Sequence, residues 1–302
     1  MLVDRGRARR RRGRMQRILV ATDFSARSDR ALRRASLLAK QRGGEVVLVH
    51  VVDDDQPERL ARAEREASLG LLGDLARTLR EADGVDARAD VVLGDPFDAI
   101  VRAIETHGAD VAAIGAHRRR LLRDVFLGTT AERVVRESRR PVLVVNALPT
   151  AAYRSVLVAV DLGGASQRLL ESFDRLGLAE RAAVSAAHVF EAPAAPRLAR
   201  AAIPGSEIAG YVSEEEQRAA HALGALLGAC AFPADHKLLR RNEGSVGDTL
   251  CAMARDADAD LVVVGTQARK GLAGFLLGSV AHAVLRACDR DVLAIPLRDD
   301  TA

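Results

Sequence analysis

The sequence contains no tryptophan, and aromatic residues make up only 3% of its 302 residues. Proteins that hold nucleic-acid bases by stacking need aromatic side chains, so this scarcity argues against that class of function. The three cysteines, Cys230, Cys251 and Cys288, form no Cys-x-x-Cys pair, and the seven histidines are scattered. We therefore expect buried, reduced thiols in a cytoplasmic protein, and no zinc site.

Long apolar runs are also missing, since none approaches the roughly 18 residues that a membrane-spanning helix needs. Positive charge is concentrated in residues 1–14, which hold seven Arg and one Asp, whereas the whole chain carries a net charge of only +4. We interpret this segment as a disordered tail or as sequence upstream of the true start at Met15. Contact of the tail with nucleic acid or anionic lipid is the alternative. No apolar segment follows the charges, so no signal peptide is expected.

The remainder of the chain is an internal repeat. "RILVATD" (17–23) matches "SVLVAVD" (155–161), and the His-Val pair at 50–51 matches that at 188–189, both at a spacing of 138 residues. Later segments match at a spacing of 150, such as 127–145 with 277–295. The second copy must therefore contain a twelve-residue insertion. We place it in the Pro- and Ala-rich stretch 190–205, which reads as a loop, with a helix starting near "SEEEQ" (213–217).

Each copy alternates short apolar runs with longer amphipathic ones, as α/β proteins with a parallel sheet do. In the first copy we expect strands near 17–22, 45–52, 87–92, 110–115 and 141–146, and helices near 26–42, 57–82, 96–107 and 129–138. The fold class is thus α/β, with two repeated open five-stranded parallel sheets of the Rossmann-like type. We divide the chain into the tail 1–14, a first domain at 15–148 and a second domain at 153–298.

Two glycine-framed segments, 115–129 and 265–279, each connect an apolar strand to a helix. Ligands of open parallel sheets bind beyond the carboxyl ends of the strands, where a helix N-terminus favours anions. Gly265, Gly278 and Ser279 are therefore suited to hold a phosphate with main-chain N–H groups. Asp161 ends the first strand of its copy and can accept hydrogen bonds from a ribose or an adenine amino group. The alternative is that the glycines only form turns, but the pattern occurs twice.

On these motifs the sequence resembles a tandem universal stress protein from Met15 to about Leu297, with the adenine nucleotide alpha hydrolase-like fold. The family pattern is Gly, two residues, Gly, nine residues, Gly, then Ser or Thr. Here Ala268 and Arg118 replace the middle glycine of the second and first copies. The methyl of Ala268 is a small obstacle to phosphate, whereas Arg118 either blocks the cradle or binds phosphate from the side. The resemblance implies that ATP, with or without Mg²⁺, binds more readily in the second copy than in the first.

The resemblance also assigns roles to individual residues. Asp23 and Asp161 would lie at the adenine–ribose end, and Val51 and Val189 would line the adenine. Ile114 and Val264 precede the first glycines of the pattern and would touch the nucleotide. The remaining implied contacts are Gly115, Arg118, Gly128, Thr129 and Thr130 in the first copy and Gly265, Ala268, Gly278, Ser279 and Val280 in the second.

The implied function is a nucleotide-responsive stress-response regulator without catalysis, or with slow ATP hydrolysis at most. Neither a Walker-type GxxxxGK[ST] motif nor an SGGxDS-type loop occurs. The alternatives are a nucleotide-free structural or dimerisation module and a slow ATPase. The apolar fifth strands of the two copies would pair to form an internal pseudo-dimer, since exposed strand edges are usually covered. A homodimer and unidentified protein partners are further expectations, whereas a membrane or a nucleic acid is not.

Overall fold

The computed structural model describes residues 15–116, 129–266 and 277–297. The first copy contains β1 (Arg17–Ala21), α1 (Ala26–Arg42), β2 (Glu45–Val52), α2 (Glu58–Thr78), the π-helical turn η1 (Leu79–Asp83), β3 (Asp86–Leu93), α3 (Pro96–Thr106), β4 (Val111–Gly115), α4 (Thr129–Glu137) and β5 (Val142–Val145). The second contains β6 (Ser155–Ala159), α5 (Gly164–Leu176), β7 (Ala183–Phe190), α6 (Ala195–Arg200), α7 (Gly205–Ala229), β8 (His236–Arg241), α8 (Val246–Asp256), β9 (Leu261–Thr266), α9 (Ser279–Ala287) and β10 (Asp291–Pro296). The predicted elements of the first copy are confirmed to within a few residues.

The ten strands of the described residues form one sheet, in the order β3-β2-β1-β4-β5-β10-β9-β6-β7-β8. Within each copy the neighbouring strands are parallel, and the predicted α/β fold class with two five-stranded parallel sheets is confirmed. The two five-stranded halves form one continuous sheet because the fifth strands of the two copies, β5 and β10, pair antiparallel. Leu143 and Leu293, which are equivalent residues of the two copies, lie opposite each other in this pair. A pseudo-twofold axis therefore passes through the middle of the sheet.

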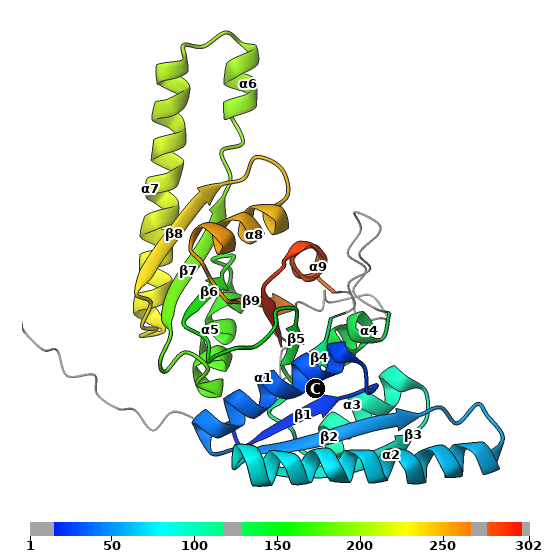
Figure 1. Cartoon of the computed structure of the whole chain (residues 1–302). Coiled ribbons are helices and arrows are strands. Elements are labelled where there is room, and N and C mark those ends of the chain that lie inside the picture. Colours follow the sequence, from blue (N-terminus) through cyan, green and yellow to red (C-terminus); the bar gives the residue numbers. More distant parts are fainter. Residues whose placement is uncertain (1–14, 117–128, 267–276, 298–302) are drawn as a thin grey trace, which may run out of the picture.

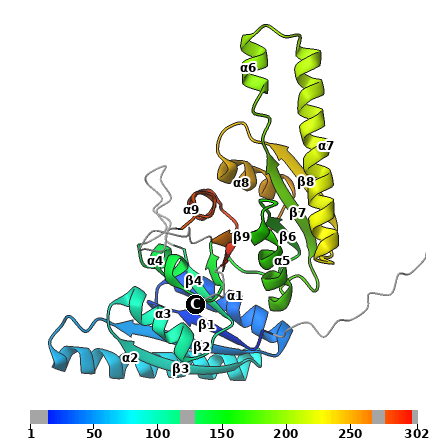
Figure 2. The same cartoon turned by 180° about the vertical axis from the view of Figure 1, so that it is seen from behind.

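Helices cover both faces of the sheet (Figures 1 and 2). Side chains of α1, α2, α5 and α7 pack with one face, and those of α3, α4, α8 and α9 pack with the other. In β1, Ile18 and Val20 point to the first layer and Leu19 to the second, as the period of a strand requires. Cys251 and Cys288 are buried in the second layer as reduced thiols, as expected, whereas Cys230 is only half-buried.

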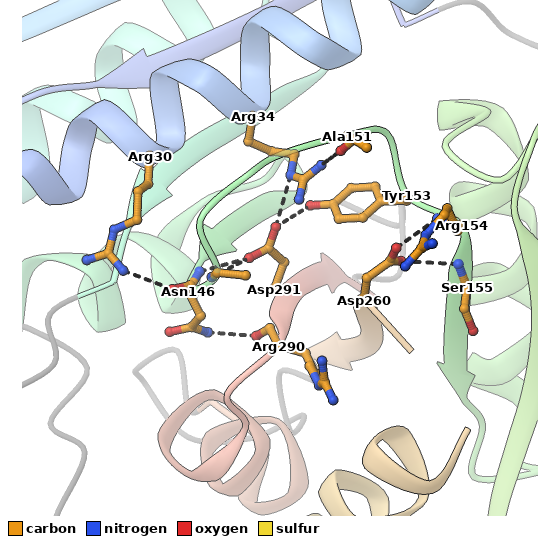
Figure 3. Close-up of polar contacts among 11 residues, drawn as sticks. Arg30, Arg34, Asn146, Ala151, Tyr153, Arg154, Ser155, Asp260, Arg290 and Asp291 are labelled. Carbon is orange, nitrogen blue, oxygen red and sulfur yellow. Dashed lines mark hydrogen bonds and ion pairs between the residues drawn. The ribbon is translucent and has the colours of Figure 1, made fainter. Parts of the chain in front are cut away.

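A buried polar network joins the two copies beside the β5–β10 pair (Figure 3). The carboxylate of Asp291, which is fully buried, lies 3.1 Å from Nε of Arg34 and accepts a 2.7 Å hydrogen bond from the Tyr153 hydroxyl. Its other oxygen accepts from the backbone N–H groups of Asn146 and Ala147 in the linker between the copies. The linker and the helix α1 of the first copy are thereby fixed to the last strand of the second.

The insertion lies where it was predicted, but its form was predicted wrongly. The stretch 190–205 holds the helix α6 rather than only a loop, and "SEEEQ" lies inside α7 rather than at its start. The hydroxyl of Tyr211 in α7 accepts a hydrogen bond from the amide of Ala194, at the start of α6. Figures 1 and 2 show α6 and the first half of α7 extending from the body as a hairpin. In the described part of the chain, no helix combines the length and the apolar character needed to cross a membrane.

Candidate functional site

A cavity of about 890 Å³ opens at the carboxyl edge of the second copy's strands. It lies at the switch point of that half-sheet, where β6 stands between β7 and β9. Ligands of open α/β sheets bind at this position. Its walls come from the ends of β6, β7 and β9, from the first turns of α5, α8 and α9, and from Leu297 after β10. The volume is within the range of small-molecule sites, about 300–1,000 Å³.

The N-terminus of α9 forms one wall of the cavity. Gly278 is the N-cap residue, and its carbonyl oxygen accepts the first helical hydrogen bond, from the amide of His282. The amides of Ser279, Val280 and Ala281 have no acceptor within the described residues. Free amides at the positive end of a helix attract anions. The backbone at Gly278 has a φ of −55°, so this position does not depend on the left-handed freedom of glycine.

A tight turn at the end of β6 holds Asp161 in the lining of the cavity. One carboxylate oxygen of Asp161 accepts a 2.6 Å hydrogen bond from the Ser166 hydroxyl and a 2.9 Å bond from the amide of Gly163. Leu162 between them has a φ of 62°, a left-handed conformation that is uncommon for a branched residue. The turn fixes the orientation of the carboxylate, yet Asp161 remains exposed. It can therefore accept hydrogen bonds from a ligand.

The end of β7 supplies two further polar side chains to the cavity, His188 and Glu191. Nδ1 of His188 lies 2.9 Å from the carbonyl oxygen of Val160, which can only accept, so the ring must donate from Nδ1. Its other nitrogen, Nε2, is then left to contact a ligand. The carboxylate of Glu191 accepts a 2.7 Å hydrogen bond from the side-chain amide of Asn242. His50 makes the equivalent bond in the first copy, with the carbonyl oxygen of Thr22.

One residue that lines the cavity, His282, also contacts the first copy. His282, in the first turn of α9, lines the cavity, and its Nδ1 lies 3.6 Å from a carboxylate oxygen of Glu132 on α4. The two residues occupy equivalent positions in their copies, since they are 150 apart. The pseudo-twofold axis thus brings the first turns of α4 and α9 together.

The corresponding edge of the first copy is packed differently. A Cβ at Gly115 would lie only 2.3 Å from the backbone carbonyl oxygen of Arg27 on α1. Glycine is therefore required at this position for the helix to approach the strand. At Gly265 a Cβ would instead meet the side chain of Leu297, with 2.3 Å to Cδ1. One glycine of the repeated pattern thus serves helix packing, and the other lies in the wall of a cavity.

Asp23, the equivalent of Asp161, is engaged by its own copy. Nη2 of Arg27 lies 3.5 Å from its carboxylate, and Ser25 donates to it from both the amide and the hydroxyl. Burial raises the pKa of Asp23, but hydrogen bonds from Ser25 and Ser28 and the charge of Arg27 outweigh this effect and lower it to about 2. The second copy has Ala165 in place of Arg27, and no described residue forms an ion pair with Asp161.

The structure gathers most of the residues predicted for the second copy around this one cavity: Asp161, Val189, Val264, Gly265, Gly278, Ser279 and Val280. Ala268 lies outside the described residues, as do Arg118 and Gly128 of the first copy. Asp23, Val51, Ile114 and Gly115 lie at or beside the carboxyl edge of the first half-sheet, and α4 begins at Thr129, followed by Thr130. Whether these residues bind a nucleotide stays a prediction.

Sequence reasoning did not select several residues that line the cavity: Ser166, Leu169, Glu191, Val246, Leu250, Leu277, His282 and Leu297. Ser166 could have been selected from the sequence, because the repeat has a serine, Ser28, at the equivalent position of the first copy. His282 could not be selected in this way, because the equivalent residue of the first copy is Glu132. Among the described residues, no group of three or more His, Cys, Asp or Glu side chains is arranged to hold a metal ion.

The chain matches one protein family over most of its length. The family model described as "Universal stress protein family" matches residues 15–146 and again 152–296. Universal stress protein Rv2005c of Mycobacterium tuberculosis is 27% identical over 293 residues, covering 89% of this chain and 93% of that protein. Universal stress protein E of Escherichia coli is 26% identical over 299 residues, with 93% of each chain covered.

Solved structures show the same fold. A universal stress protein from Archaeoglobus fulgidus superposes with a TM-score of 0.70 at 19% identity, covering 94% of this chain and 99% of that one. A putative universal stress protein from Pseudomonas aeruginosa gives a TM-score of 0.67 at 22% identity, with 93% of each chain covered. With two family matches that together span nearly the whole chain, this protein belongs to the universal stress protein family and carries two of its domains in tandem.

Proposed function

We propose that this universal stress protein binds an adenine nucleotide, ATP in the first place, in the cavity of its second copy. The observation that carries the proposal is the cavity of about 890 Å³ whose lining combines the free amides of α9 with the fixed carboxylate of Asp161. Such a site offers donors to phosphate and an acceptor to the ribose or adenine. Binding, rather than turnover, is the activity we assign, and partner proteins would respond to the bound state.

The fit of a nucleotide rests on the residues present. The amides of Ser279 and Val280 would hold the phosphates, and Asp161 would accept hydrogen bonds at the nucleoside end. Bound ATP would supply a polyanion whose charge the helix dipole of α9 favours. Mg²⁺, if it takes part, would be carried by the phosphates, because the described residues offer no preformed metal cluster.

We propose that the first copy binds nucleotide weakly or not at all. The backbone of α1 approaches Gly115 closely, and Arg27 with Ser25 already engages the carboxylate of Asp23. A ligand there would have to displace contacts that the chain makes with itself. The first copy would then act chiefly as the structural partner of the second.

Two measurements test the proposal. Denaturing the purified protein and analysing the supernatant would reveal co-purified adenine nucleotide, and calorimetric titration with ATP would give the stoichiometry. We expect one ATP per chain. The repeat offers a matched pair of variants: Asp161→Asn should weaken ATP binding by about tenfold or more, the effect of one hydrogen bond to a charged group, whereas Asp23→Asn should change it by less than about twofold.

Three other results would contradict the proposal. If no nucleotide is released and ATP produces no binding heat, the protein is a nucleotide-free structural or dimerisation module. Two ATP molecules per chain, with equal effects of the two Asp variants, would overturn the assignment to the second copy. Steady-state release of phosphate at about one per second, a typical enzyme rate, would make the protein an ATPase.

A further inference from the structure

His282 occupies a particular place in the cavity. It lies one turn inside α9, and its amide makes the first hydrogen bond of the helix, to Gly278. Side chains of a helix incline toward its N-terminus, so the imidazole is directed to the end that carries the free amides. Gly278, Ser279 and Val280 line the same cavity as His282. The ring is therefore positioned beside the point at which an anion would meet the helix.

The partner of this imidazole comes from the other copy. Nδ1 of His282 lies 3.6 Å from the carboxylate of Glu132, and about a third of each side chain is exposed (36% and 34%). A carboxylate on one side of an imidazole orients the ring and leaves the opposite nitrogen, Nε2, for a second contact. In its protonated form the ring can donate from both nitrogens. An imidazole held in this way can connect Glu132 to a phosphate.

We infer that His282 is a specificity residue of the second copy's cavity, and that Glu132 of the first copy positions it. The ligand class it selects is adenine nucleotides that carry phosphates, in preference to the free nucleoside. The inference rests on the function proposed above and extends it, because the site of one copy is then incomplete without the other. Glu132 and His282 are equivalent residues, so the same position serves two different roles in the two copies.

The test compares ATP with adenosine by calorimetric titration of the full chain. His282→Ala should weaken ATP binding by about tenfold or more, as expected for a lost hydrogen bond to a charged group, and change adenosine binding by less than about twofold. His282→Gln, which keeps a donor without the charge, should fall between wild type and His282→Ala. Retained adenosine binding also shows that the cavity of each variant is intact.

The role of Glu132 is tested by a double-mutant cycle. Glu132→Gln should weaken ATP binding by about threefold in the wild-type background and have no further effect in His282→Ala, because a positioning residue acts only through the residue it positions. The matched controls are His221→Ala and Glu214→Gln on the exposed face of α7, which should leave the affinity for both ligands unchanged.

The outcomes separate the two proposals. If wild-type protein binds neither ATP nor adenosine, the proposed function fails and the inference fails with it. If wild type binds ATP but His282→Ala leaves that affinity unchanged, or weakens ATP and adenosine equally, only the inference is overturned. Additive losses in Glu132→Gln and His282→Ala would show that Glu132 does not act through His282.

Discussion

At the scale of single residues, Asp23 shows how the two copies have diverged at one position. Its pKa is lowered to about 2 from the ordinary value of 3.8, so the folded state favours the charged carboxylate. The stabilisation is complete above pH 4 and is lost as the pH falls from about 4 toward 2. Because the side chain of Asp23 is 61% exposed, solvent screening limits its contribution to the free energy of unfolding to less than about 1 kcal/mol.

We therefore predict that Asp23→Asn lowers the free energy of unfolding by about 0.5–1 kcal/mol at pH 7, and that the difference from wild type narrows below pH 4. Urea unfolding at both pH values measures it. Asp54→Asn, in an exposed turn, is the control for removing one surface charge. A difference that stayed constant between pH 7 and pH 3 would contradict the ionised role of Asp23.

The two glycines that open the repeated pattern, Gly115 and Gly265, differ in how much room they leave for a side chain. In Gly115→Ala the new methyl would lie 2.3 Å from a backbone oxygen of α1, which can move only with the helix. In Gly265→Ala it would meet the end of the Leu297 side chain, which can rotate. We expect losses in the free energy of unfolding of about 3 and 1 kcal/mol, respectively. Equal losses in urea unfolding would mean that α1 does not hold its backbone against Gly115.

Repetition identified the positions that matter, but it did not separate structural roles from binding roles. Asp110 and Asp260 are repeated as faithfully as Asp23 and Asp161, yet they accept hydrogen bonds from the backbone at the starts of β1 and β6, at the edge away from the cavity. The edge depends on whether the Asp precedes or follows its strand: Asp110 and Asp260 precede β4 and β9, whereas Asp23 and Asp161 follow β1 and β6. His282 lacks any such signal, because its significance depends on Glu132, 150 residues away.

At the scale of elements, the contact between the last two helices of each copy is built in two ways. In the first copy the guanidinium of Arg133 on α4 lies over the ring of Phe97 on α3, 3.2 Å from its centroid. The equivalent residues of the second copy are Ala283 and Gly247, and a Cβ at Gly247 would lie 2.4 Å from that of Ala283. The helices α8 and α9, which both line the cavity, can therefore pack this closely only because Gly247 has no side chain.

We predict that Gly247→Ala separates α8 from α9 and lowers the free energy of unfolding by about 1–3 kcal/mol, as overpacking does. It should also weaken any ligand held by the first turn of α9. Gly228→Ala in α7 is the matched control, since nothing lies within 4 Å of the added methyl, and it should stabilise the protein by up to about 1 kcal/mol through helix propensity. A stabilising Gly247→Ala, measured by urea unfolding, would contradict the close approach.

Element boundaries were predictable where periodicity and local signals agree. The helix predicted at 26–42 is α1, with Ser25 as its N-cap and Gly43 in the left-handed conformation at its end. The hairpin of α6 and α7 was not predictable, because Pro204, Gly205 and Gly210 are turn signals that locally favour a loop. Packing between α6 and α7, including the Ala194–Tyr211 hydrogen bond, outweighs them.

At the scale of the whole molecule, the two copies are joined by main-chain pairing and by buried charged groups, among them Asp291 with Arg34. The pairing of β5 with β10 covers two apolar edges at once. The Asp291 network in Figure 3 breaks the symmetry of the junction, because Pro141 occupies the position of Asp291 in the first copy. Its partner Arg34 is 257 residues away, so the sequence alone gave no indication of the pair.

The contribution of Asp291 to this junction can be measured by substitution. Asp291→Ala leaves the guanidinium of Arg34, which is 5% exposed, without its carboxylate, and it removes the acceptor of Tyr153 and of two linker amides. Removing one partner of a buried pair costs about 3–5 kcal/mol, so a loss of this size is expected in urea unfolding. Asp256→Ala, which removes a half-exposed pair with Arg240, should cost less than about 1 kcal/mol.

The pair itself is distinguished from the general effect of the substitution by a second variant. Arg34→Met with Asp291→Ala removes both charges, and burial of an unpaired charge is then no longer a cost, so the double variant should be more stable than Asp291→Ala alone. If instead the two losses simply add, Arg34 and Asp291 stabilise the protein independently. The junction would then depend on the β5–β10 pairing and the linker hydrogen bonds rather than on a buried ion pair.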